Sequence, residues 1–296
     1  MREAPRALGL SFVDYLLAVI AWLSVSSASI LVLLSGSSAL VCAFWRLAIA
    51  VAVILAYAAL SGQFIPRYSR TTAVLSIIAG LFLATHFLTW MESLFHIPVS
   101  LSTTIVMLYP IVALVYETIL GISRPTRREA AGILVAFLGA LVAVRPYIAG
   151  ETLFGVLLAA TGALTGAAYF TLGRLLRRSG VSLASYTVLC YSSAALSLLC
   201  YSAVVAQPLL PSSSTSWPYL ILLALVPMIG GHTVMNYLMK KFKSYVVSAI
   251  GFGEAPGATV LASLVLSQSV DLNVVAGMVV SMAGALYTIT ASAKAS

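Results

Sequence analysis

Charge is what this sequence has least of: of its 296 residues, only 8% are Asp, Glu, Lys or Arg. Soluble domains carry about 25%. Eight acidic and sixteen basic side chains cannot cover the surface of a soluble fold of this length, and 61% of the residues are hydrophobic. The mean hydropathy is +1.06. Composition therefore excludes a soluble globular protein and makes lipid the solvent for most side chains.

Cysteines and catalytic motifs are also scarce. Cys42, Cys190 and Cys200 lie inside apolar segments and show neither metal-ligand spacing nor a disulfide pattern. The sequence has no H-E-x-x-H motif, no phosphate-binding loop and no nucleophile elbow in a suitable setting. The basic residues form short, separate clusters, which excludes a continuous face for nucleic acid. We expect no cofactor, no metal and no nucleic-acid partner; the expected partners are the lipid bilayer and a small-molecule substrate, with a homo-oligomer left open.

Apolar runs of about 20 residues without alternation predict membrane-spanning helices rather than a barrel. Polar interruptions divide the chain into ten expected spans: 11–34, 39–61, 73–95, 99–121, 129–146, 153–173, 183–206, 218–239, 245–267 and 273–291. The first has no small-residue cleavage site, which indicates a retained span. Pro110 and Pro256 fall inside the fourth and ninth, where we expect kinks.

The basic residues lie almost entirely on one side of these spans. Fourteen of the 16 fall at the ends that share a side: Arg2, Arg6, Arg67, Arg70, Arg124, Arg127, Arg128, Arg174, Arg177, Arg178, Lys240, Lys241, Lys243 and Lys294. Arg145 is on the other side, and Arg46 is within the second span. Because positively charged loops stay in the cytoplasm, we expect a multi-pass protein of the cell membrane with both termini cytoplasmic.

The two halves of the chain are weakly alike. Ala131-Gly132 and Gly139-Ala140-Leu141 recur 145 residues later as Ala276-Gly277 and Gly284-Ala285-Leu286, and His86 with His232 and Pro110 with Pro256 are 146 apart. Five spans per half is an odd number, so the second half must enter the membrane upside down. The sequence predicts an all-α fold of two inverted five-helix repeats, 1–147 and 148–296, around a central cavity. Inverted repeats of this kind are typical of secondary transporters.

Two histidines fall near the membrane midplane, His86 in the third span and His232 in the eighth. Trp90 and Asn236 follow them by four residues and share their helix faces. One interpretation is a substrate cavity lined by these four residues. The other is a pair of histidines that join helices through hydrogen bonds. Trp22, Tyr109 and Tyr169 are near mid-span and either line the same path or serve packing.

Intramembrane charges need a partner or a function. Glu254 has no obvious cation at its depth, and we hypothesise that it exchanges a proton for substrate, with His232 tuning it; the alternative is a structural acceptor. Arg46 and Glu92 fall at similar depths, which predicts an ion pair or an outer gate. Glu117 is one turn from the cytoplasmic end of its span, within reach of Arg124 or Arg127, and we expect it to be an anchor or part of an inner-gate pair rather than a substrate ligand.

Two further predictions concern contacts within the monomer. Asp14 is similarly close to the membrane interface, and we expect it to anchor the chain or to form an inner-gate pair. Gly162 and Gly166 form a G-x-x-x-G pair, which allows close approach of two helices inside the monomer.

Several of these residues also resemble a known family. The stretch His86-Phe87, Trp90, Ser93-Leu94, Pro110, the segment Gly173-Arg174-Leu175-Leu176-Arg177, and Gly231-His232-Thr233, Asn236, Lys240 and Gly253-Glu254 resemble EamA-type permeases of the drug/metabolite transporter superfamily. The resemblance covers nearly the whole chain. It implies a secondary transporter, commonly an exporter of small metabolites or amphiphilic compounds, without a nucleotide-binding domain.

Two functions follow. The first is a transporter that works by alternating access, an exporter that is coupled to protons or facilitated. The second is an intramembrane enzyme that acts on a lipid or isoprenoid substrate, with His and Glu as acid–base groups. The inverted repeat and the missing catalytic motifs favour transport. An interior with few arginines argues against multiply charged anions as substrates, and amino acids, other small amphiphiles and organic cations stay open.

Overall fold

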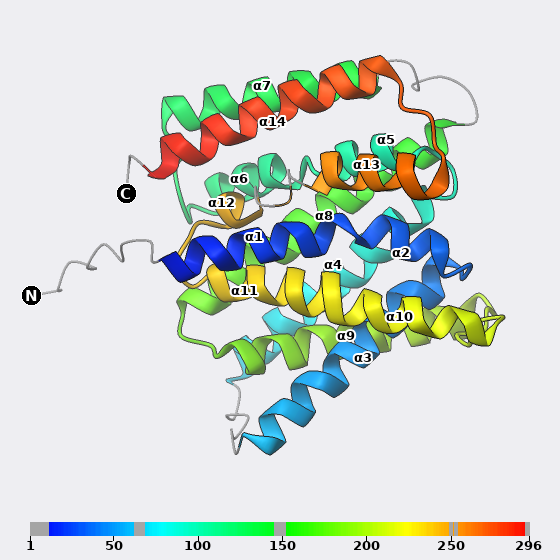
Figure 1. The fold of residues 1–296 in the computed structure, drawn as a ribbon. Coiled ribbons are helices and arrows are strands. Elements are labelled where there is room, and N and C mark those ends of the chain that lie inside the picture. Colours follow the sequence, from blue (N-terminus) through cyan, green and yellow to red (C-terminus); the bar gives the residue numbers. More distant parts are fainter. Residues whose placement is uncertain (1–11, 62–68, 145–151, 249–250, 252–253, 294–296) are drawn as a thin grey trace, which may run out of the picture.

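The computed structural model describes residues 12–61, 69–144, 152–248, 251 and 254–293, which form helices and no strand. In the first half these are α1 (Phe12–Ser26), α2 (Ala28–Leu34), α3 (Ala39–Leu60), α4 (Arg70–Ser93), α5 (Val99–Val106), α6 (Tyr109–Ile119) and α7 (Arg127–Val144). In the second half they are α8 (Thr152–Arg178), α9 (Leu183–Val204), η2 (Ser214–Ser216), α10 (Trp217–Leu223), η3 (Ala224–Thr233), α11 (Val234–Leu238), α12 (Ser244–Ser248), α13 (Glu254–Leu266) and α14 (Leu272–Ala293). Figure 1 shows them as one bundle of roughly parallel and antiparallel helices.

Each of the ten predicted spans is occupied by one helix or by successive helices, which confirms the all-α, polytopic architecture. Seven described stretches are long and apolar enough to cross a membrane, and Glu254–Leu266 and Leu272–Thr288 are shorter apolar helices. The sixth span is longer than predicted, since α8 continues to Arg178 instead of ending at 173. This extra turn holds Arg174 and Arg177 in helical register with the membrane part of α8.

Several spans are interrupted. The fourth breaks at Met107–Leu108, with Pro110 in the first turn of α6, as its missing N–H predicts. The ninth span holds two described helices, α12 and α13, and Pro256 lies in the first turn of α13. The interruption at Ser27 between α1 and α2, and the π-helical turns of η3 around Pro227, were not predicted.

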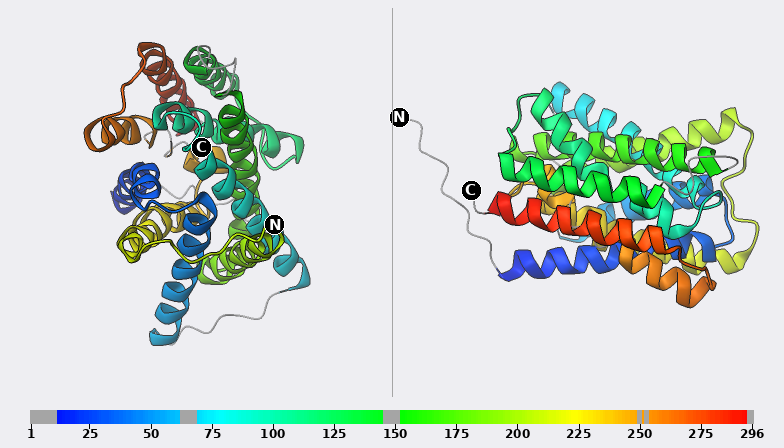
Figure 2. Two further views of the ribbon diagram at one scale, coloured as in Figure 1. Left: turned by 90° about the vertical axis from the view of Figure 1, so that its right-hand side faces the viewer. Right: turned by 90° about the horizontal axis from the view of Figure 1, so that it is seen from above.

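The two repeats pack in matched pairs. α4 of the first half contacts α8, and its counterpart η3 in the second half contacts α1, the counterpart of α8. The counterparts α3 and α9 contact each other, as do α7 and α14, and the contact of α5 with α13 is matched by that of α12 with α6. Figures 1 and 2 show α7 and α14 side by side at one margin of the bundle. This exchange symmetry is what two inverted repeats produce.

The glycines that revealed the repeat are the contact surface of α7 and α14. A Cβ atom at Gly132 would come within 2.7 Å of the Gly284 carbonyl oxygen, and one at Gly139 within 2.6 Å of the Gly277 carbonyl oxygen. Ser281 adds a hydrogen bond from its hydroxyl to the Ala136 carbonyl oxygen at 2.8 Å. Small residues let two helix backbones approach closely where lipid provides no hydrophobic drive.

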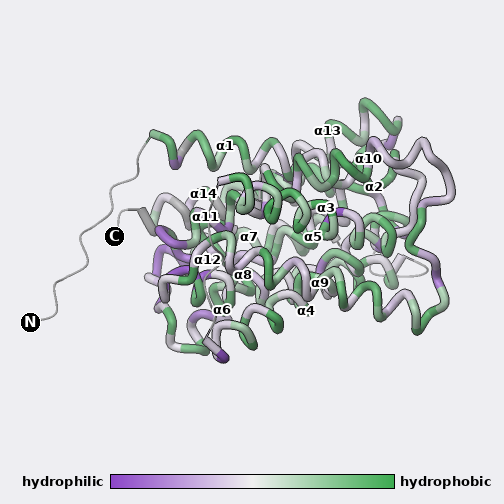
Figure 3. Tube along the Cα trace, turned by 90° about the horizontal axis from the view of Figure 1, so that it is seen from below, coloured by the Kyte–Doolittle hydropathy of each residue, from purple (hydrophilic) through white to green (hydrophobic). Residues whose placement is uncertain are grey.

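Hydrophilic residues collect at one end of the bundle, where α1 begins and α14 ends (Figures 1 and 3). We call this the basic end, because the loops after α6 and α11, the first turn of α7 and the end of α8 contribute their Arg and Lys residues there. Arg2, Arg6, Arg67, Arg145, Gly253 and Lys294 lie outside the described residues, as does the predicted boundary between 147 and 148.

Candidate functional site

A small cavity lies between the two halves. Its lining comes from α1 to α6 in the first half and from η3 and α13 in the second: Val25, Ala28, Arg46, His86, Trp90, Val106, Met107, Tyr109, His232 and Glu254. Its volume is about 10 Å³, room for about one water molecule. The interruptions between α1 and α2 and between α5 and α6, the π-helical turns of η3 and the start of α13 all border it. Discontinuous helices at the repeat interface are where secondary transporters bind their substrates.

The two repeat-related histidines meet at this cavity, with ring centroids 6.1 Å apart. His86 Nδ1 donates to the Gly162 carbonyl oxygen at 2.7 Å, which fixes the tautomer, and its ring stacks on Trp90. The G-x-x-x-G pair makes room for this bond, because a Cβ at Gly166 would lie 2.7 Å from His86 Nδ1. The expected role of these glycines in internal packing is confirmed.

His232 and Trp90 keep unused polar atoms at the cavity. His232 is stacked on Phe170 with ring centroids 5.7 Å apart, and its Nδ1 has no hydrogen-bond partner among the described residues. The Trp90 indole N–H also lacks one there, although Trp90 is only 3% exposed. Buried polar groups are ordinarily bonded, so these atoms are available to a ligand.

Arg46 brings a buried guanidinium group to the site. It is completely buried, its guanidinium lies 4.1 Å over the centre of the Phe87 ring, and none of its three nitrogens has a hydrogen-bond partner in the described part of the chain. Glu254, 5% exposed, lines the same cavity. The prediction that Glu254 has no cation at its depth is therefore wrong: Arg46 reaches the cavity from α3.

The predicted pair of Arg46 and Glu92 is wrong as well. Glu92 lies at the surface, where its carboxylate is 3.3 Å from His96 Nε2. Trp90 faces the cavity, and Glu92 follows it by two residues, about 200° further around the helix. Similar depth in the membrane does not bring two side chains onto facing sides of their helices.

Trp22 is not part of the cavity. The buried stripe of α1 and α2 runs through Ala21, Val25 and Ala28, and Trp22 lies beside it with 38% of its surface exposed. Because both lipid and the protein core are apolar, the pattern of hydrophobic residues does not identify the inward face of this helix. The prediction of Trp22 as a substrate-binding residue is corrected on this geometry.

Asn236 and Tyr169 lie next to the cavity lining rather than in it. The Asn236 amide donates to the hydroxyls of Tyr169 and Tyr191, the latter at 3.2 Å, and the Tyr169 ring is 6.1 Å from that of His232. Asn236 Oδ1 has no partner among the described residues. The Tyr169 ring therefore lies against His232 while its hydroxyl is bonded to Asn236. Tyr109, by contrast, lines the cavity directly.

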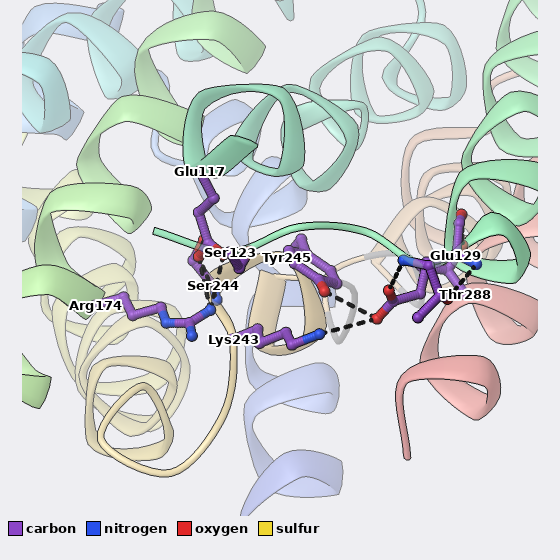
Figure 4. A network of polar contacts seen from close by, with 9 residues as sticks. Glu117, Ser123, Glu129, Arg174, Lys243, Ser244, Tyr245 and Thr288 are labelled. Carbon is purple, nitrogen blue, oxygen red and sulfur yellow. Dashed lines mark hydrogen bonds and ion pairs between the residues drawn. The ribbon is translucent and has the colours of Figure 1, made fainter. Parts of the chain in front are cut away.

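Glu117 pairs with Arg174 at 2.8 Å, not with Arg124 or Arg127 (Figure 4). The extra turn of α8 brings Arg174 to it, and this turn was missed in the sequence. Asp14 pairs with Lys241 at 2.6 Å, as expected of an anchor or gate residue. Glu129, which the sequence did not single out, is fully buried and accepts bonds from Lys243 and Tyr245. The described residues hold no group of three His, Cys, Asp or Glu that would bind a metal.

Comparisons with known proteins agree with this geometry. The model of the EamA-like transporter family matches twice, over residues 9–145 and 153–290. No curated protein matches the chain significantly. A solved structure described as "Crystal structure of protein" has a similar fold, with a TM-score of 0.74 and 20% sequence identity over 94% of this chain and 98% of that one. The twofold match accounts for nearly all of the sequence, and the chain belongs to the EamA-like transporter family, a group within the drug/metabolite transporter superfamily.

Proposed function

We propose that this protein exports a small amphiphilic metabolite across the cell membrane by alternating access, with the halves 1–147 and 148–296 as the two moving units and both termini in the cytoplasm. The observation that carries the proposal is the meeting of His86 and His232, equivalent residues of the two repeats, with Arg46 and Glu254 in a cavity between the halves. Intramembrane ionisable groups in such a place ordinarily serve transport. Family membership supports transport and gives no support to the enzyme alternative.

The size of the cavity supports alternating access. Ligand sites are ordinarily about 300–1,000 Å³, and this cavity holds about 10 Å³. A metabolite therefore enters only if the halves separate on one side. The interruptions in the spans around the cavity provide the places where such a movement can bend the helices.

The unpaired groups favour a substrate with one hydrogen-bond acceptor, such as a carboxylate, on an apolar or aromatic body. The Arg46 guanidinium and the Trp90 indole are donors without partners among the described residues. The rings of His86, Trp90 and Tyr109 offer flat apolar surfaces beside them. A single arginine remains a poor match for a multiply charged anion.

We propose that proton binding and substrate binding are linked through Arg46 and Glu254. Ionised Glu254 neutralises Arg46, whereas protonated Glu254 leaves the guanidinium free for an acceptor group of the substrate. This replaces the exchange of proton for substrate expected from an isolated carboxylate. In this scheme the outward concentration gradient of the metabolite drives export.

The test begins with a metabolite screen in proteoliposomes, with and without a pH gradient, followed by Glu254→Gln. We expect this variant to transport the substrate down its gradient while its rate no longer varies with pH. The matched control is Glu92→Gln, which removes a surface carboxylate and leaves the pH dependence in place. An unchanged pH dependence in Glu254→Gln would show that Glu254 is structural. Product formation in detergent, where no gradient exists, would favour the enzyme instead.

A further inference from the structure

The basic end of the molecule is closed by carboxylates of the first half that bind the second half. Glu117 on α6 and Glu129 on α7 are both fully buried (Figure 4). Arg174 Nη1 donates to the two carboxylate oxygens of Glu117 at 2.9 and 2.8 Å, and the Ser123 hydroxyl donates at 2.5 Å. Charged hydrogen bonds of this length are among the stronger polar contacts in proteins.

The same two carboxylates hold three consecutive residues at the start of α12. The Ser244 backbone N–H donates to Glu117 Oε1 at 3.0 Å, and the Ser244 hydroxyl donates to the same atom. Lys243 Nζ and the Tyr245 hydroxyl donate to Glu129 Oε1 at 3.2 and 2.9 Å. We call this set, with Arg174, the carboxylate clamp. Every bond that it makes to α8 or to residues 243–245 joins one half of the molecule to the other.

Among the residues that the structure describes, the opposite end has no equivalent of this clamp. The repeat spacing of 146 matches Lys243, Ser244, Tyr245 and Glu117 with Ile97, Pro98, Val99 and Ser263, and the spacing of 145 matches Glu129 with Val274. None of these counterparts is charged. In the described part of the chain, the bonds between the halves at that end are neutral: the Val99 backbone N–H donates to Gln268 Oε1 at 3.2 Å, Gln207 Nε2 to Ser38 Oγ at 2.8 Å and Trp45 Nε1 to the Leu209 carbonyl oxygen at 2.8 Å.

A hollow takes the place of the clamp at that end. A cavity of about 470 Å³ is lined by residues 94–98 and 267–269, the repeat counterparts of the segments that the clamp joins. Among the described residues, buried ion pairs therefore hold one end of the molecule shut, whereas neutral hydrogen bonds beside a hollow hold the other.

We propose that the carboxylate clamp is the lock of the gate at the basic end and that it keeps the empty substrate site closed to the cytoplasm. This rests on the proposed function and orientation. When the gate is closed, Glu117 and Arg174 compensate each other away from water. If Glu117 loses its charge, Arg174 stays buried without a carboxylate, which is strongly unfavourable. Opening the gate returns Arg174 to water, so the variant favours the open form.

The test measures the gate directly, by the distance between two spin labels in detergent without substrate. Labels replace Arg124 and Lys240 at the basic end, and in a second sample Phe95 and Ser269 at the opposite end, with the exposed Cys200 changed to Ser. We expect Glu117→Gln to raise the open population at the basic end by at least about tenfold and to shorten the distance at the opposite end. The matched control, Glu92→Gln, breaks an exposed pair and should change neither distance.

An unchanged distance distribution in a folded, monodisperse Glu117→Gln protein would overturn the proposal. If that variant does not fold, Lys243→Gln provides the same test. Lys243 is 30% exposed, so removing its charge destabilises the protein less. An unchanged distance distribution in Lys243→Gln would also overturn the proposal. The measurement needs no substrate. A shift of the gate in a protein that transports nothing would contradict the proposed function alone, and transport with an immovable gate would contradict the lock alone.

Discussion

At the scale of single residues, two tryptophans with similar sequence surroundings have opposite environments. Trp90 lines the cavity with an unpaired indole N–H, and Trp22 faces outward from α1. We expect Trp90→Phe to weaken substrate binding several-fold, up to about tenfold, because the ring remains while its donor is lost. The measurement is the transport KM in proteoliposomes, with Trp22→Phe as the control. Equal KM values for both variants would remove Trp90 from the binding site.

The ion pair of Lys241 with Asp14 predicts how stability depends on pH. Its hydrogen bond to Asp14 raises the pKa of Lys241 above the ordinary lysine value. The stabilisation from this pair is present below the ordinary lysine pKa and is lost as the pH rises through the raised one. We expect Lys241→Met to lower thermal stability by the same amount at pH 6 and pH 8. A difference that changes sign between these pH values would contradict the assignment.

The site residues could be predicted only where the sequence contains an internal comparison. His86 and His232 were found because each repeat carries one, and Glu254 because a carboxylate at mid-membrane depth is rare. The predictions that were wrong or inexact depend on the rotation of each helix about its axis, which decides where a side chain points. These are the predictions for Trp22, for the Arg46–Glu92 pair and for Asn236. An apolar helix between lipid and an apolar core does not reveal that rotation in its pattern of hydrophobic residues.

At the scale of helices, the glycine contact between α7 and α14 allows a test of how much close packing contributes to stability. A larger side chain at Gly139 would collide with the Gly277 carbonyl region of α14. We expect Gly139→Leu to destabilise the protein by about 1–3 kcal/mol, the ordinary cost of overpacking. The measurement is thermal unfolding in detergent, with Leu138→Ala on the exposed face as the control. A melting temperature equal to that of the wild type would show that this interface does not limit stability.

The helices themselves were largely predictable from the sequence. Lipid requires every backbone group to be bonded within its own segment, so long apolar runs have to be helices. Proline identified the interruption before Pro110, and Pro256 lies in the first turn of α13. The interruption at Ser27 and the π-helical turns around Pro227 were not predictable, because they depend on how neighbouring helices pack there. The same is true of the last turn of α8, where the sequence predicted a loop and the structure has a helix whose Arg174 binds Glu117.

At the scale of the whole molecule, the proposed orientation can be tested with single cysteines. Ser213 lies in the loop before α10 and Arg124 in the loop after α6, and both are exposed. With Cys200 changed to Ser, we expect a membrane-impermeant maleimide to label Ser213→Cys in intact cells. Arg124→Cys should react only after the cells are permeabilised. The reverse pattern would place the basic end outside.

The unlike ends of the bundle have a thermodynamic consequence that is independent of any particular substrate. Stabilising the closed gate on one side cannot make transport unidirectional. Microscopic reversibility requires equal forward and backward fluxes of substrate when there is no driving gradient. What the charges at the basic end determine is where the empty site waits between cycles. If it waits facing away from the cytoplasm, the apparent dissociation constant measured from the cytoplasm is the intrinsic one divided by the fraction of time that the site faces the cytoplasm. The same protein then shows two different half-saturation concentrations from its two sides, although its intrinsic affinity is one number.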